Sequence, residues 1–195
     1  MNEERAWPSR SQHIQPQSTE EPTLRELPAA FVAKTRSLLK SEYLPKIERC
    51  LEKLTDEQSW RRASEESNSV GNLILHLSGN ARQWIVSGVG GAEDHRVRQG
   101  EFDARASVPR ADLLALLRET LEEVDGVLSG LDLSRLLERR LIQGQEVTIL
   151  EAIFHVVEHF SMHTGQIILL TKILARKDLR FYDFSSGLPV ASWHE

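Results

Sequence analysis

Three histidines spaced four residues apart are the most informative feature of the chain. His155, His159 and His163 lie in the segment Glu151 to Lys172, EAIFHVVEHFSMHTGQIILLTK, and the whole chain has seven histidines. Side chains four residues apart on an α-helix lie one turn apart on nearly the same face. Two imidazole nitrogens at that spacing can bind one metal ion about 2.0–2.1 Å away. The alternative is that some of them are core histidines with hydrogen bonds to backbone or carboxylate groups.

A fourth histidine offers a third ligand from another helix. His76 stands between two leucines in the apolar segment Asn68 to Val86, where an imidazole without a partner would be costly. By itself it could be a hydrogen-bonded core histidine. With two histidines of the later helix it would complete three neutral nitrogen ligands and leave an open position, which is the usual composition of a catalytic zinc-type site. Asn72 and Asn80 lie one turn to either side of His76, so we expect a polar lining around it.

Two motifs together resemble those of the DinB-like superfamily, the YfiT-type metal-binding four-helix bundles. The earlier is NSVGNLILHLSGN (Asn68 to Asn80), and the later is HVVEHFSMHTGQI (His155 to Ile167). The resemblance implies that one histidine of the second helix and two of the last helix hold a divalent ion. By motif position these ligands are His76, His159 and His163, with His155 one turn further along the same face.

The resemblance extends from about Phe31 to Leu174, and two further segments, Asp94 to Phe102 and Leu179 to Pro189, suggest a largely uncharacterised branch. It implies an all-α fold, a DinB-like four-helix bundle (up-down-down-up) with a long connection between helices 2 and 3, and a homodimer. Characterised members use glutathione, mycothiol or bacillithiol. We therefore expect a metal-dependent thiol S-transferase that acts on a small-molecule substrate, with zinc or nickel activating the thiol. Hydrolysis, in which the ion activates water, is a close variant.

Two other interpretations remain open. The ion could hold together the helices of a non-catalytic stress-response or small-ligand-binding bundle. Alternatively, the histidines could pack in the core without any ion. A structural zinc site is usually closed by four protein ligands, often including cysteine, whereas three histidines match here and Cys50 lies outside the motifs. A fourth ligand from His155 or Glu158 would favour the structural interpretation.

The remaining candidates have two interpretations each. Glu158 could orient a histidine or be a solvated carboxylate, and Gln166 could face the cavity or serve packing. Arg96 and Arg98 could clamp an anionic substrate or lie in a solvated loop, and Trp84 could line the pocket or fill the core. The catalytic candidates are thus Glu158 and Gln166, and the substrate-binding candidates are Asn72, Asn80, Trp84, Arg96, Arg98 and His155.

Composition indicates the setting. With 195 residues, of which 40% are hydrophobic, and a net charge of −5, the chain fits one globular domain without a basic face for nucleic acid, despite a family name that implies DNA damage. The single cysteine, Cys50, cannot form an internal disulfide and fits a reducing compartment. The N-terminal segment lacks an apolar signal-peptide core, and no apolar run is long enough to span a membrane. We therefore expect a cytoplasmic protein.

Hydrophobic periodicity and turn residues predict the elements that position the histidines. Three parts are expected: a flexible arm over residues 1–22, the bundle over 23–178, and a tail over 179–195 packed on or near the bundle. The expected elements before the third helix are a helix from Leu24 to Leu54 that Pro45 kinks or divides, a second from Asn68 or Ser69 to before Gly88, and a polar linker from Ala92 to Val108. They are followed by a third helix from Pro109 to about Leu128, a short extended or hairpin segment around Gly144, and a fourth helix from Ile149, capped by Thr148 and Glu151, to about Ala175.

Overall fold

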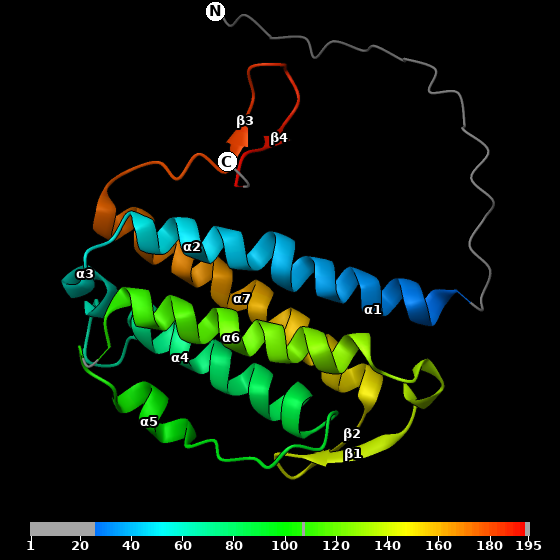
Figure 1. Ribbon diagram of the computed structural model, residues 1–195. Coiled ribbons are helices and arrows are strands. Elements are labelled where there is room, and N and C mark those ends of the chain that lie inside the picture. The colour runs from blue at the N-terminus through cyan, green and yellow to red at the C-terminus, as the bar shows by residue number, and fades with distance from the viewer. Residues whose placement is uncertain (1–25, 107, 194–195) are drawn as a thin grey trace, which may run out of the picture.

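Four long helices pack side by side and follow the predicted up-down-down-up order (Figure 1). The computed structural model describes residues 26–106 and 108–193, so the expected N-terminal arm lies outside the described residues. The first long helix, Leu27–Glu52, consists of α1 Leu27–Leu38, the π-helical turn η1 Leu39–Tyr43 and α2 Leu44–Glu52. The second, Val70–Ser87, consists of α4 Val70–Ala81 and the π-helical η2 Arg82–Ser87. The third is α6 Arg110–Ser129, and the fourth is α7 Ile149–Ala175. The smaller elements are α3 Asp56–Trp60, α5 Arg98–Asp103, the 3-10 turn η3 Leu133–Arg135, and the strands β1 Arg139–Ile142, β2 Gln145–Thr148, β3 Tyr182–Asp183 and β4 Val190–Ala191.

The first helix continues through Pro45, and the interruption expected there takes the form of the π-helical turn η1 directly before the proline. A proline has no N–H, so the carbonyl four residues earlier loses its helical donor. That carbonyl belongs to Ser41, and the indole Nε1 of Trp193 donates to it over 3.2 Å. The proline therefore creates a docking point for the C-terminal tail.

The core lies between the four helices and is almost entirely aliphatic. Its largest fully buried side chains include Leu77 from α4, Leu117 and Leu121 from α6, and Ile153 and Phe160 from α7. Burial of this kind stabilises by about 1.5–3 kcal/mol for each large apolar side chain. The histidines of α4 and α7 thus stand on helices that the core fixes in place.

A β-hairpin directly precedes α7 in the chain. Strands β1 and β2 pair antiparallel, and Gln143 and Gly144 both have positive φ (50° and 75°) at their turn, as expected for a two-residue hairpin. Thr148 then caps α7: its hydroxyl accepts from the backbone N–H of Glu151, whose carboxylate accepts from the backbone N–H of Thr148. The predicted capping box and the helix limits are both confirmed.

The linker between the second and third helices is more ordered than its polarity predicts. It contains the short helix α5, which runs beside α4 (Figure 1). The side-chain amide of Asn72 donates to the carbonyls of Glu101, over 2.8 Å, and Ala104, over 3.1 Å. Asn72 also caps α4 together with Ser69, so its polar atoms hold the linker in place rather than lining a cavity.

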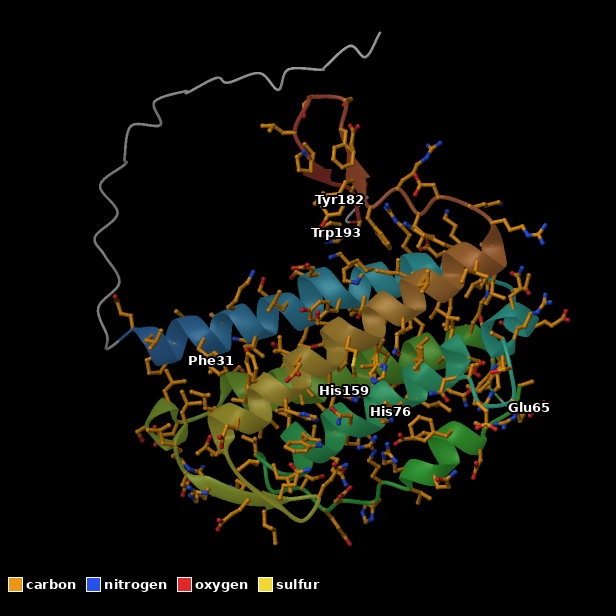
Figure 2. All side chains as sticks on the ribbon, turned by 180° about the vertical axis from the view of Figure 1, so that it is seen from behind. Phe31, Glu65, His76, His159, Tyr182 and Trp193 are labelled. Carbon is orange, nitrogen blue, oxygen red and sulfur yellow. The ribbon has the colours of Figure 1, made fainter. Side chains whose placement is uncertain are left out.

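The tail after α7 forms a second, smaller hairpin of β3 and β4, which stands above α2 (Figures 1 and 2). The indole of Trp193 stacks edge-on against Tyr182, with ring centroids 5.1 Å apart. The ammonium group of Lys46 lies 4.1 Å from the centroid of the same indole. Among the described residues, no helix is both long and apolar enough to cross a membrane.

Trp60 connects the short helix α3 to the start of α4. A Cβ at Gly71 would lie 2.9 Å from the Trp60 ring, so only a glycine allows the indole to pack this closely. The Trp60 Nε1 donates to the carbonyl of Val108 over 2.7 Å, which ties the entry of α6 to the same point.

We expect Gly71→Ala to lower the free energy of unfolding by about 1–3 kcal/mol, because the added methyl group overpacks a buried ring. The matched control is Gly126→Ala on α6, where a Cβ meets nothing within 4 Å and the loss of a helical glycine should stabilise by about 0.5–1 kcal/mol. Urea denaturation of both variants measures the two changes. Equal stabilities would contradict the close packing of Trp60 on Gly71.

Candidate metal centre

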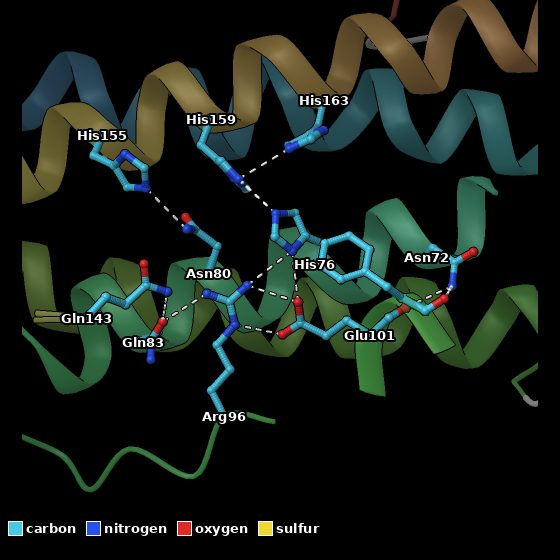
Figure 3. A network of polar contacts seen from close by, with 11 residues as sticks. Asn72, His76, Asn80, Gln83, Arg96, Glu101, Gln143, His155, His159 and His163 are labelled. Carbon is cyan, nitrogen blue, oxygen red and sulfur yellow. Dashed lines mark hydrogen bonds and ion pairs between the residues drawn. The ribbon is translucent and has the colours of Figure 1, made fainter. Parts of the chain in front are cut away.

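Three histidine nitrogens from two helices converge inside the bundle. His76 projects from α4 toward α7, and His159 and His163 project from α7 toward α4 (Figures 2 and 3). The Nε2 atom of His159 lies 3.0 Å from Nε2 of His76 and 3.2 Å from Nε2 of His163. These three residues form the one group of three or more His, Cys, Asp or Glu side chains in residues 26–106 and 108–193 that could hold a metal ion.

Two of the three nitrogen–nitrogen separations suit a single small divalent ion. Two ligands about 2.0–2.1 Å from one ion lie roughly 2.9 Å apart at a right angle and roughly 3.4 Å apart at the tetrahedral angle. The separations of 3.0 and 3.2 Å from His159 fall within that range, and the ligand atoms of all three histidines lie within 4.8 Å of one another. A set of three imidazoles suits zinc, nickel, copper or iron.

The carboxylate of Glu101, which was not among the candidate residues, orients His76. Its Nδ1 lies 2.8 Å from Oε2 of Glu101, in α5. With the ring proton on Nδ1, His76 donates to Glu101 and its Nε2 lone pair is free to bind an ion. Metal-binding histidines usually have such a second partner. The NH2 group of Arg96 also lies 3.1 Å from this Nδ1.

The two histidines of α7 are also suited to act as neutral ligands. The Nδ1 of His163 donates to Oε1 of Gln166 over 2.7 Å, which directs its Nε2 toward His159. Burial, followed by the charges of the neighbouring histidines, lowers the pKa of His159 to about 3. His159 Nδ1 is buried without a hydrogen-bond partner in the described part of the chain. The imidazole of His159 is therefore neutral at physiological pH.

Arg96 neutralises Glu101 and is itself almost fully buried. Its guanidinium donates to both carboxylate oxygens, with Nε 2.7 Å from Oε1 and NH2 2.9 Å from Oε2. Burial alone would raise the pKa of the Glu101 carboxyl, but hydrogen bonds from Arg96 and His76 and the charge of Arg96 outweigh it and lower the pKa. The anion clamp considered for Arg96 is therefore already occupied by a carboxylate of the chain itself.

Gly79 provides the surface on which this ion pair rests. A Cβ at Gly79 would lie 2.1 Å from Oε1 of Glu101 and 3.0 Å from Nε of Arg96. The carboxylate can approach α4 this closely only where the helix has no side chain. The glycine in the HLSGN motif is thus part of the structure that orients His76.

His155 lies beside the three histidines but not among the convergent nitrogens. Its Nε2 accepts from the amide of Asn80 over 3.2 Å (Figure 3). Its ring stacks on Trp84 with centroids 4.0 Å apart. Asn80 Oδ1 and Trp84 Nε1 are buried and have no hydrogen-bond partner among the described residues. Buried polar atoms of this kind cost about 1–3 kcal/mol each unless a ligand or water binds them.

The other candidate residues lie further from the nitrogens. Glu158 is exposed on the outside of α7, which agrees with its interpretation as a solvated carboxylate. The Arg98 guanidinium lies 4.9 Å from the Phe102 ring centroid, and the Phe102 ring packs on His76 with centroids 4.8 Å apart. Glu101 and Phe102 were missed as individual residues because they lie in the linker, although the segment Asp94 to Phe102 that contains them was recognised as a family feature.

Comparison with known proteins gives the fold and a family. A model of the family described as "Protein of unknown function (DUF1572)" matches residues 26–187. The chain is similar to the crystal structure of a DinB-like protein from Bacillus cereus, with a TM-score of 0.58, 16% identity, and coverage of 74% of this chain and 91% of that one. It is also similar to a conserved protein from Enterococcus faecalis, with a TM-score of 0.60, 12% identity, and coverage of 80% and 99%. No curated protein matches the chain.

We expect Glu101→Gln to weaken zinc binding at least about tenfold, because a neutral amide orients and polarises the His76 ring less than a carboxylate does. Competition with a chromophoric chelator measures the affinity. The control is Glu158→Gln, an exposed change of the same kind one residue from His159, which should leave the affinity unchanged. Equal affinities in both variants would remove Glu101 from the metal centre.

Gly79→Ala should also weaken zinc binding, although Gly79 has no side chain that could contact the three histidines. The added methyl group must displace the Glu101 carboxylate and so break its contact with His76. Gly165→Ala is the matched control on α7, because a Cβ there meets nothing within 4 Å. Wild-type affinity in Gly79→Ala would show that the ion pair does not control His76.

Proposed function

The chain belongs to the family described as "Protein of unknown function (DUF1572)", and we propose that this DinB-like protein binds one divalent metal ion through His76, His159 and His163. The convergence of the three Nε2 atoms carries this proposal. Neutral rings at this spacing place their lone pairs against one another, and a cation between them turns that repulsion into attraction. Zinc and nickel are the ions we expect.

We further propose that the protein is a metal-dependent enzyme, a thiol S-transferase that uses a low-molecular-weight thiol. A divalent ion held by three neutral ligands keeps its double charge and lowers the pKa of a thiol or water molecule that it binds. Neither residue considered as a fourth ligand is positioned to bind the ion, since His155 Nε2 already accepts a hydrogen bond from Asn80 and Glu158 is exposed. An open position supports catalysis over a purely structural role.

The chain's own residues would orient the reactants. Glu101 and Gln166 keep the ring protons of His76 and His163 on Nδ1. Asn80 Oδ1 and Trp84 Nε1, which are buried without partners, offer an acceptor and a donor close to the histidines. We propose that these two atoms bind polar groups of the substrate. The proposed assembly is a homodimer.

Elemental analysis of protein purified without a metal-chelating tag tests the metal site. We expect about one divalent ion per chain in the wild type and in the control His95→Ala, whose ring is exposed away from the site, and loss of the ion from His76→Ala and His159→Ala. No metal in the wild type, even after reconstitution, would overturn the proposal and leave a helical binding module.

A thiol-consumption assay tests the enzyme. The metal-loaded protein is mixed with an electrophile and one low-molecular-weight thiol. Separate reactions use glutathione, mycothiol and bacillithiol. We expect catalysed loss of free thiol that chelation abolishes and added metal restores, and that His159→Ala lacks. A protein that binds one ion but consumes none of these thiols would instead be the non-catalytic metal-binding bundle.

A further inference from the structure

We propose that a second site, separate from the three histidines, binds a small molecule with an aliphatic body and an uncharged or cationic head group. The site is a cavity of about 530 Å³ between α4 with η2, α6, and the linker that carries α5. None of His76, His159 and His163 lines it. Its volume falls in the range of small-molecule pockets, about 300–1,000 Å³.

The walls of the cavity are suited to an aliphatic chain. Leu75 and Val86 come from the second helix, Leu116 from α6, and Val97 from the linker. Val97 is 74% exposed, so its apolar surface is available to a ligand. A ligand in the cavity would cover this apolar surface, and each buried methylene group would contribute about 0.8 kcal/mol.

One buried polar atom in the lining lacks a partner. The hydroxyl of Ser78 belongs to a residue that is only 4% exposed, and its Oγ has no hydrogen bond within the described residues. A serine hydroxyl can both donate and accept. It can therefore bind the polar end of an alcohol or an amine.

The charge of the lining selects against anions. Arg82 and Arg96 are both neutralised, by Glu123 at 2.6 Å and by Glu101 at 2.7 Å. Two further carboxylates line the cavity, on Glu93 and Asp94. His95 lines it as well, with its Nε2 3.5 Å from Oε2 of Glu93, and adds a positive charge only when it is protonated. Asp94 accepts hydrogen bonds from the Gln83 amide and the Arg96 backbone N–H, which carry no charge. The local excess of negative charge favours a cationic head group and repels a carboxylate.

The cavity and the metal centre share one wall. The Arg96–Glu101 pair lines the cavity on one side and contacts His76 Nδ1 on the other, at 2.8 Å from Glu101 and 3.1 Å from Arg96 (Figure 3). The two sites are therefore neighbours with different ligands. The proposed metal site can fail without affecting binding in the cavity.

Calorimetric titration with three probes of equal chain length tests the site: n-octylamine, n-octanol and octanoate. We expect one saturable site for the amine and the alcohol, with octanoate at least about tenfold weaker because of repulsion by the carboxylates of Glu93 and Asp94. Octanoate binding as tight as the amine, or no saturable binding of any probe, would overturn the proposal.

Three variants test where the probe binds. Leu116→Trp should abolish octylamine binding by filling the cavity, whereas Leu114→Trp, a change of the same size on α6 outside the lining, should not; circular dichroism confirms that both fold. His163→Ala removes a proposed metal ligand whose hydrogen bonds go to His159 and Gln166 rather than to the shared wall, and it should still bind octylamine. Binding that survives Leu116→Trp, or that disappears in His163→Ala, would place the amine elsewhere and overturn the separate site.

Discussion

A buried ion pair between Arg96 and Glu101 is the interaction on which the candidate metal centre depends. Both side chains are at least nine-tenths buried, and removing one partner of such a pair typically costs about 3–5 kcal/mol, because the other charge is left unpaired. A buried pair seldom adds stability over apolar residues of the same size. What this pair provides is position: it fixes a carboxylate at 2.8 Å from His76 Nδ1, and so fixes which nitrogen of that ring can bind a metal.

The rest of the fold supplies the geometry for this pair and for the opposite helix. Gly79 lets the carboxylate approach α4, and Asn72 ties the backbone of α5 to the same helix. On the other side, the capping box at Thr148 sets where α7 begins, and the four-residue spacing then places His159 and His163 one above the other. A displacement of either helix by one residue would direct the histidines away from one another.

The sequence predicts most of α7 and little of the linker, for a physical reason. Caps, turn residues and the spacing of apolar positions are local signals, so the limits of α7, the hairpin before it and the Ser69 cap of α4 could all be predicted. Arg96 and Glu101 are charged residues in a polar segment, and composition alone predicts that such residues are solvated. Arg96 and Glu101 can be buried because they neutralise each other and because Gly79, seventeen residues before Arg96, leaves room for the carboxylate. No local sequence pattern reveals either condition. The hydrogen bond between Trp193 and the Ser41 carbonyl likewise joins distant parts of the chain.

The charges on the two sides of the Arg96–Glu101 pair constrain how a thiol enzyme of this fold would work. Low-molecular-weight thiols such as glutathione carry carboxylates, and the cavity beside α6 has a local excess of negative charge from Glu93 and Asp94. An anionic thiol is therefore expected to approach the histidines near His155 of α7, where Asn80 of α4 and Trp84 of η2 have unpartnered polar atoms. The cavity then remains for an uncharged or cationic molecule. Two ligands of different charge could bind the chain at once, one on each side of the same ion pair, because Arg96 and Glu101 separate them and neutralise each other.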